Sequence, residues 1–246
     1  MMSFPILFKG HPIQTPQGLP FVVPSVRLKE LVESEMQDLK EWPAPVPEKT
    51  MTALSLSAID RTDLREKVIE GVLKDLASDQ IILWVDDPES LVQLQNEIWR
   101  PLIDQFNVRF HTHLNPITGI FRLALEAGDV RDYLESLSDF ELTGISHLAA
   151  LSHSPILSIL SFQDQMTGPQ VFEIADLHES HQRLKWGEDP LVLARNKEIQ
   201  KEICDTLEFL KSLAADRSLS QLLDGIHASN LHEEAEFGAP TGREIF

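Results

Sequence analysis

Residues 140–162 constrain the fold of this chain more than any other segment, because few charged residues interrupt a long apolar stretch. Ser138 and Glu141 precede most of it at the spacing of a capping box, which predicts the first turn of a helix. Pro155 cannot continue a regular helix and is expected to bend the element. No apolar run in the chain approaches the length of a bilayer span. We therefore expect residues 140–162 to form the buried centre of a helical unit.

Other segments show the apolar spacing or the start signals of helices. Apolar side chains recur on one face of residues 62–77. Asp-Pro pairs open residues 87–106 and a last long helix that starts at 189, and a second capping box opens residues 167–186. Residues 81–85 fit either a short strand or a helix end. The side chains expected to face inward from the last helix are Val192, Ile199, Ile203, Leu207 and Leu210.

Residues 1–24 differ from the rest, because short apolar runs alternate there with turn signals. Lys9-Gly10 stops the first run, and Pro16-Gln17-Gly18 suits a type I turn after Thr15. We expect two short hairpins that end at Pro24. Such strands are too short to be stable alone, so they must pack on the amphipathic helix predicted over residues 26–42.

Three prolines at alternate positions in residues 43–47 predict a stiff extended connector. The predicted fold class is α+β, with a small β-hairpin-rich N-terminal domain that carries one helix, followed by a larger all-helical domain. The predicted domains are 1–57 and 58–213. Residues 214–246 are expected to form an acidic, poorly ordered tail.

The chain contains 21 Lys and Arg against 39 Asp and Glu, a net charge of −18. Such a charge argues against nucleic-acid binding and against an anionic membrane surface. The single cysteine, Cys204, suits a reducing compartment. No secretory signal or Arg-rich presequence is visible at the start. A bacterial cytoplasmic protein fits best, and the mature form of an organellar protein remains an alternative.

Motifs for nucleotide binding and acyl-transfer chemistry are missing from the sequence. The chain has only 11 glycines and contains neither a phosphate loop nor a G-x-G-x-x-G or G-x-S-x-G motif. We therefore expect no cofactor and no ATP consumption. The histidines offer one possible catalytic function, which we keep as the alternative to a protein without catalytic activity. This is a metal-dependent hydrolase that uses His111, His113, His178 and His181, with Glu179 as the base.

Glu179, Gln182 and Trp186 lie at i, i+3 and i+7, so they share one face of a predicted helix. A carboxylate, an amide and an aromatic ring on one face can form a recognition surface. Spacing alone favours the other interpretation, a core tryptophan with a hydrogen-bonded glutamate beside it.

Five segments in the same order resemble a family of mitochondrial and alphaproteobacterial assembly factors that bind the alpha subunit of F-type ATP synthase. The segments are residues 15–24, 58–61 (A-I-D-R), 87–102, 117–120 and 177–188, the last with acids, Gln and then Trp-Gly.

The resemblance implies an assembly chaperone without catalytic activity that holds the free alpha subunit, as a monomer, until the beta subunit arrives. It implies the bacterial cytoplasm, or the mitochondrial matrix in a eukaryote. Met36 stands where the family usually has Trp in the first helix. The implied partner-binding residues are Glu179, Gln182, Trp186, Gly187, Glu188 and Met36.

Overall fold

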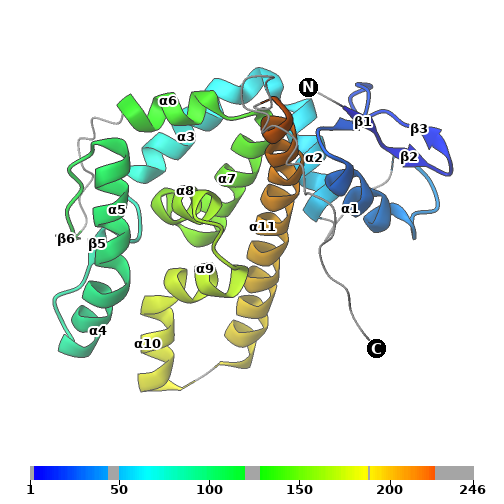
Figure 1. Ribbon diagram of the computed structural model, residues 1–246. Helices are drawn as coiled ribbons and strands as arrows, with labels where there is room; N and C mark the ends of the chain where they lie inside the picture. Colours follow the sequence, from blue (N-terminus) through cyan, green and yellow to red (C-terminus); the bar gives the residue numbers. More distant parts are fainter. Residues whose placement is uncertain (1–2, 44–49, 120–127, 188, 225–246) are drawn as a thin grey trace, which may run out of the picture.

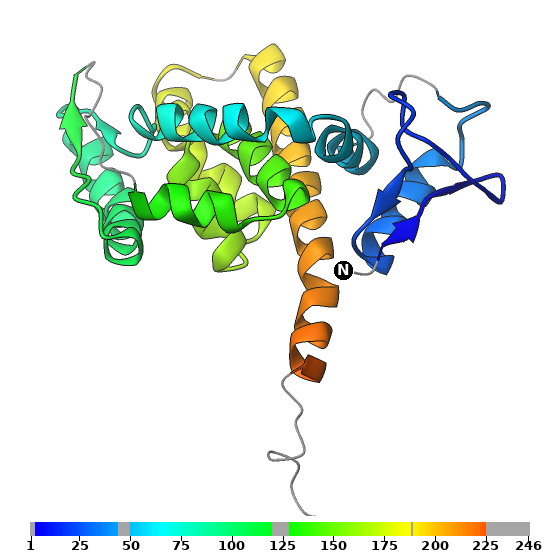
Figure 2. The same cartoon turned by 90° about the horizontal axis from the view of Figure 1, so that it is seen from above.

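The computed structural model describes residues 3–43, 50–119, 128–187 and 189–224, with the backbone alone for 214–224 (Figure 1). A small unit of short strands and one helix stands beside a larger group of helices, and the long helix α11 (Pro190–Asp224) runs between them (Figure 2). Helix α11 packs on helices of both units. The fold is therefore α+β with the predicted order of parts. No helix among the described residues is long and apolar enough to cross a bilayer.

The N-terminal strands form the two predicted hairpins. Strand β2 (Leu7–Phe8) pairs antiparallel with β3 (His11–Pro12), and an antiparallel bridge joins Gln14 to Pro20 in the second hairpin. Strand β1 (Phe4–Pro5) also pairs antiparallel with β4 (Val22–Val23), a contact between strands that are not consecutive and that was not predicted. The amide of Gly18 donates to the carbonyl of Thr15 at 2.9 Å, which closes the predicted turn between β3 and β4. The turn signals of the sequence were thus sufficient to predict the two hairpins but not the pairing of β1 with β4.

Helix α1 (Val26–Met36) covers the hairpins with its predicted apolar stripe, and it buries Leu28, Val32 and Met36. Its predicted end at Trp42 is wrong, because the chain leaves the helix after Met36. The Trp42 indole instead donates to the carbonyl of Gln14 at 2.6 Å and stacks on the ring of Phe21, with centroids 5.8 Å apart. This contact with the hairpins replaces a further helical turn.

Helix α2 (Thr50–Asp60) joins the small unit to the large one. The Glu35 carboxylate accepts from the amides of Met51 and Thr52 at 3.0 and 2.8 Å, which caps the first turn of α2 from α1. At the other end, Asp60 accepts from the hydroxyl of Thr15 at 2.6 Å. The predicted boundary between residues 57 and 58 falls inside α2, and the division into domains stays a prediction.

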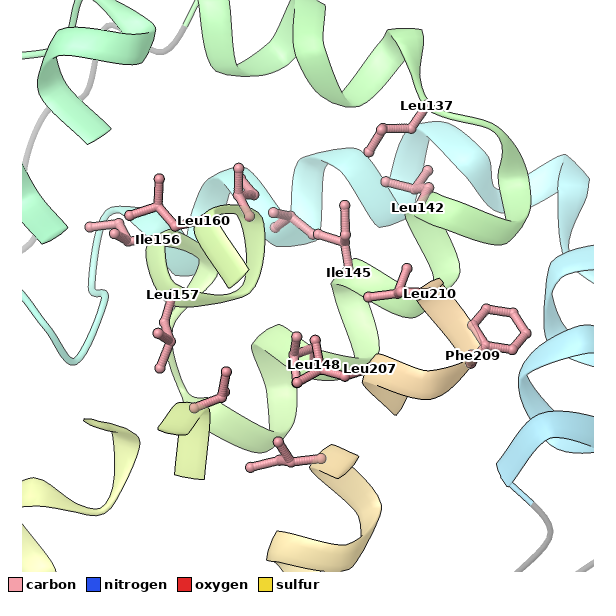
Figure 3. Packing of buried hydrophobic residues seen from close by; sticks show 14 of the residues in the cluster. Leu137, Leu142, Ile145, Leu148, Ile156, Leu157, Leu160, Leu207, Phe209 and Leu210 are labelled. Atoms are coloured by element: carbon pink, nitrogen blue, oxygen red, sulfur yellow. The ribbon is translucent and has the colours of Figure 1, made fainter. Parts of the chain in front are cut away.

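The apolar segment is the buried centre of the helical unit, as predicted. It forms α7 (Asp139–Ser152) and α8 (Pro155–Gln163), and the Ser138–Glu141 capping box is present. Leu148 of α7 lies beside Leu207 of α11, and Leu142 lies beside Leu137 at the other end of α7 (Figure 3). The segment is interrupted rather than bent, because Ser154 caps a new helix that has Pro155 in its first turn.

A buried carboxylate fixes the start of α8. Asp79 Oδ2 accepts from the amide of Ile156 at 2.8 Å, and Asp79 Oδ1 accepts from the amide of Ile81 at 2.9 Å. The Asp79 side chain is fully buried, and this burial raises its pKa to about 7. The N-terminus of α8 therefore depends on a residue far away in the sequence.

The predicted helix over residues 87–106 is present, but its ends and its interior differ from the prediction. It begins at Glu89 without a side-chain cap from Asp87 and continues to Phe110 as α4 (Glu89–Leu94), the π-helical turn η2 (Gln95–Trp99) and α5 (Arg100–Phe110). Pro101 lacks an amide hydrogen, and a wider turn accommodates its ring.

The remaining elements complete the helical unit. Strands β5 (Leu83–Trp84) and β6 (Ile117–Thr118) form one parallel pair. Of the two structures expected for residues 81–85, a short strand or a helix end, the strand is therefore the one observed. The predicted tail start at 214 falls inside α11, and residues 225–246 lie outside the described part. The other helices are η1 (Thr62–Leu64), α3 (Arg65–Leu76), α6 (Gly128–Ser136), α9 (Gly168–Ala175) and α10 (Leu177–Trp186).

Candidate functional site

Residues 167–186 form two helices, α9 and α10, and not the single helix that was predicted. The break lies at Asp176, whose carboxylate accepts from both terminal nitrogens of Arg183, with Oδ1 3.1 Å from Nη1. Both side chains are largely buried. This ion pair fixes α10 at a new angle, so that α10 lies at one end of the molecule, near α4 (Figure 1).

His178 attaches α10 to the π-helical turn. Its Nε2 lies 2.9 Å from Oε1 of the buried Gln95, and its ring lies 4.5 Å from that of Trp99, centroid to centroid. The same Gln95 oxygen accepts from the amide of Val85, so the imidazole Nε2 is the donor in its pair. Burial lowers the pKa of His178, against the opposite but smaller effect of Glu179. The neutral imidazole is therefore the form that the site prefers.

The four histidines of the hydrolase alternative do not gather into a metal site. His181 pairs with the hydroxyl of Ser90 at 2.9 Å, whereas His111 pairs with Asp129 at 2.7 Å. Among the described residues, which include all four histidines, no group of three or more His, Cys, Asp or Glu could hold a metal ion. The alternative is therefore not supported, and His178 and His181 position α10.

The stripe predicted on α10 is exposed. Glu179 and Gln182 are exposed, and 73% of Trp186 is accessible to solvent. The interpretation of Trp186 as a core residue is therefore wrong. The tryptophan that is fully buried near α10 is Trp99. In the described part of the chain, no hydrogen bond or ion pair engages the side chain of Glu179 or Gln182, so both remain available to a partner.

The other predicted partner-binding residues differ in position. Gly187 ends α10 in an exposed conformation with φ of 89°, where its amide donates to the carbonyl of Arg183. Glu188 lies outside the described residues. Met36 is only 2% exposed and packs in the core between α1 and the hairpins, so it offers almost no surface to a partner.

Sequence reasoning missed a group of exposed apolar side chains beside this stripe. Leu184 is 88% exposed and Leu191 is 80% exposed, at the end of α10 and the start of α11. Val192 was predicted to face inward and is 42% exposed, because the first turns of α11 extend beyond the core. We call Leu184, Trp186, Leu191 and Val192 the α10–α11 corner. Leu184 stands between Arg183 and Lys185, which is a signal that could have indicated its exposure, whereas Leu191 opens an apolar run in the sequence and gave no such signal.

The fold is similar to that of solved structures of one class of protein, the chaperones. The structure of Atp12 from Paracoccus denitrificans shares 23% identity over 84% of this chain and 90% of its own length, with a TM-score of 0.75. A mutant of that protein matches at 24% identity over the same shares of the two chains, with a TM-score of 0.76. A putative chaperone from Agrobacterium tumefaciens shares 26% identity over 86% of this chain and 80% of its own, with a TM-score of 0.75. The fold is that of these chaperones.

A family model described as ATP12 chaperone protein matches residues 2–107, which end within α5. Together with the structural matches, this shows that the chain is similar to ATP12 chaperone proteins in sequence over residues 2–107 and in overall fold. The matched residues do not reach α10, so the role of the exposed stripe is a separate question.

Proposed function

We propose that the chain binds the unassembled alpha subunit of F-type ATP synthase and protects it until it pairs with the beta subunit. The observation that carries this proposal is the exposed stripe of Glu179, Gln182 and Trp186 on a helix held firmly from behind by His178. A binding surface needs accessible side chains on a rigid support, because ordering a mobile segment reduces affinity.

The chemistry of the stripe suits such a client. A subunit without its neighbours exposes apolar surface that aggregates, and a chaperone must cover that surface. Trp186 offers a large aromatic side chain, the type that most often dominates binding energy. Glu179 offers a carboxylate for a basic residue of the client, and the net charge of −18 accelerates encounter with a basic surface.

The proposed mechanism uses binding alone. The sequence has no phosphate-binding loop, so release is expected when the beta subunit competes for the same client surface rather than when ATP is hydrolysed. We propose that one copy of the chain binds one alpha subunit. The proposed compartment is the bacterial cytoplasm, or the mitochondrial matrix in a eukaryote.

The test is recovery of the client. The tagged chain is isolated from its own cells under conditions in which free alpha subunit accumulates, and the captured proteins are probed for that subunit. Glu179→Lys should reduce capture at least tenfold, which is about 1.4 kcal/mol of binding free energy.

The matched control is Asp132→Lys. Asp132 is an exposed acid on α6, which lies at the opposite end of the helical unit from α10 (Figure 1), and the same change in net charge should leave capture unaltered there. Absence of the alpha subunit from captures by the unmodified chain would overturn the proposal.

A further inference from the structure

A small polar pocket lies where the end of α2 and the start of α3 pack against α7 (Figure 1). Its volume is about 80 Å³. One water molecule needs about 10–15 Å³, so the pocket has room for a chemical group of several atoms. The described residues of α10 contribute nothing to its lining. The pocket is therefore a separate feature from the exposed stripe of Glu179.

Arg65 forms one wall of the pocket, and its guanidinium is fixed by several hydrogen bonds. Its Nη1 donates to Asp139 Oδ1 at 2.6 Å, and its Nη2 donates to the carbonyls of Leu134 and Leu137 at 3.2 and 2.6 Å. These bonds tie the start of α3 to the end of α6 and the start of α7. Asp139 is the only acid among the described lining residues, and Arg65 neutralises it.

Arg61 supplies a second cation, and this one has no counter-ion in the described part of the chain. No hydrogen bond or ion pair engages its guanidinium there, and the neighbouring Asp60 accepts from the hydroxyl of Thr15 instead. The Arg61 amide donates to the carbonyl of Ser57 at 3.2 Å, which extends the last turn of α2 and puts both residues on one face. In a chain of net charge −18, the pocket thus carries one positive charge in excess.

Two hydroxyl groups complete the set of available donors. Ser57 on α2 and Thr143 on α7 both line the pocket, and neither hydroxyl forms a hydrogen bond with another described residue. The hydroxyls of Thr62 and Ser146, which also line it, donate to nearby backbone carbonyls. An unpaired guanidinium and two unpaired hydroxyls around one space match the acceptors of an oxyanion.

The apolar part of the lining favours a carboxylate over an inorganic anion. Ala58, Val68 and Leu142 line the same pocket. A carboxylate on a short hydrocarbon stem can place its oxygens on Arg61 and its methylene groups against these side chains. Phosphate has only polar oxygens, and some of them would face the apolar wall without a donor. The planar guanidinium also fits the two oxygens of a carboxylate.

We propose that this pocket binds the carboxylate of a short-chain acid, either a free organic acid or a glutamate side chain of another protein. Arg61 holds the two oxygens, the hydroxyls of Ser57 and Thr143 donate to the remaining lone pairs, and Arg65 keeps Asp139 from repelling the ligand. The inference goes beyond the proposed function, because it depends neither on the alpha subunit nor on α10.

Nuclear magnetic resonance of the nitrogen-labelled full chain measures binding of butyrate, of inorganic phosphate and of sodium chloride at matched ionic strength. Butyrate should give saturable shifts of amides on α2 and α7 at about 10–50 mM, because a single exposed ion pair is weak. Phosphate should bind at least about threefold more weakly. Tighter binding of phosphate would overturn the carboxylate assignment. Shifts that sodium chloride reproduces, or no saturable shift at all, would overturn the site.

Arg61→Gln should weaken butyrate binding roughly tenfold or more, because the charge-assisted hydrogen bonds are lost. Arg195→Gln is the matched control, since Arg195 is an exposed arginine on α11 without an ion pair in the described part of the chain. It should leave the affinity within about twofold. Equal weakening by both changes would mean that net charge rather than the pocket attracts the anion, and it would overturn the proposal.

Thr143→Val keeps the shape of the side chain and removes its hydroxyl. It should weaken butyrate binding by roughly threefold, because one neutral hydrogen bond is lost. Thermal unfolding of the Arg61→Gln and Thr143→Val proteins should match that of the unmodified chain, which separates a lost donor from a lost fold. An affinity equal to that of the unmodified chain would remove Thr143 from the proposed site.

A blocked peptide, acetyl-Ala-Glu-Ala-amide, distinguishes the two sources of the carboxylate, because its glutamate side chain is its only acid. If the peptide binds and Arg61→Gln weakens it, the pocket accepts an acidic side chain of another protein. If butyrate alone binds, the ligand is a free acid, and both results support a carboxylate site. Glu179→Lys should leave butyrate binding unaltered, so this proposal and the proposed function can fail independently.

Discussion

Helices α8 and α10 have nearly the same length, nine and ten residues, but opposite relations to the core. Seven residues of α8 are buried, whereas α10 buries Leu177 alone. Packing therefore holds α8, and polar contacts of His178, His181 and Arg183 hold α10. The difference teaches that a helix can be fixed without being buried: a few specific contacts hold α10, so the rest of its surface stays exposed and accessible to the proposed partner.

The same truncation in both helices should give the largest difference. Leu157 of α8 is fully buried and Leu184 of α10 is 88% exposed. Leu157→Ala should lower the free energy of unfolding by about 2–5 kcal/mol, because it leaves a cavity in the core. Leu184→Ala should change it by less than about 0.5 kcal/mol. Urea denaturation measures both, and equal losses would break the comparison.

The second prediction concerns the carboxylate that caps α8. Asp79→Ala should cost about 1–3 kcal/mol, because the amides of Ile81 and Ile156 lose their buried acceptor. The raised pKa of Asp79, about 7, adds a pH dependence. Between its ordinary value of 3.8 and about 7 the native state keeps a proton that the unfolded state has lost. This contribution to stability is full below pH 3.8 and is lost as the pH rises through 7.

Urea denaturation at several pH values across that window tests the sign. The unmodified chain should lose the Asp79 contribution with rising pH, and Asp79→Ala should show a flatter profile. Asp132→Ala, which removes an exposed carboxylate from α6, serves as the control and should leave the profile unchanged. A steeper profile in Asp79→Ala would contradict the burial of a protonated carboxyl group.

Acid should weaken the docking of α10 but should not weaken α8, because the contribution of Asp79 to α8 is retained at low pH. The lowered pKa of His178 means that the unfolded state takes up a proton near pH 6.5 while the docked imidazole stays neutral. The stability that His178 gives to α10 is therefore present above pH 6.5 and is lost as the pH falls below it. Hydrogen exchange, corrected for intrinsic rates, should show the α10 amides losing protection while those of α8 keep it.

His178→Leu is the variant that tests the cause. It should reduce protection of α10 by about 1 kcal/mol at neutral pH, because the hydrogen bond to Gln95 is lost. It should also remove the further loss in acid. If α10 in the variant still loses protection below pH 6.5, then another group is responsible for the acid response.

The smallest expected effect on stability belongs to the residue with the largest expected effect on binding. Glu179→Lys should change the free energy of unfolding by less than about 0.5 kcal/mol, because the side chain is exposed and has no partner in the described part of the chain. Thermal and urea unfolding check this. A large loss would mean that Glu179 supports the fold, and it would remove the binding interpretation of the capture experiment.

Much of the fold could be predicted because the relevant signals are local. The turn at Thr15–Gly18, the capping box at Ser138 and the Asp189-Pro190 helix start all depend on residues that are close in sequence. The errors occur where a distant residue decides the outcome. Trp42 lies outside the first helix because its indole bonds to the carbonyl of Gln14 and stacks on Phe21. The helix over residues 167–186 is divided at Asp176 because this residue forms a largely buried ion pair with Arg183.

The candidate site was predicted in part. Spacing placed Glu179, Gln182 and Trp186 on one helix face, and the structure keeps them there. Spacing could not tell whether that face meets the core, and it favoured the wrong answer for Trp186. Spacing also predicted that Val192 faces inward, although it is partly exposed. It could not reveal that Met36, a predicted partner-binding residue, is buried.

The sequence by itself determined the local elements, the buried character of residues 140–162 and the order of a β-hairpin unit before a helical one. The tertiary structure decided which apolar side chains are buried and which are exposed. The physical reason is that amphipathicity gives each helix an apolar face, whereas burial requires a neighbour for that face. Helix α8 has such neighbours in α7, α5 and α3, and the α10–α11 corner has none among the described residues.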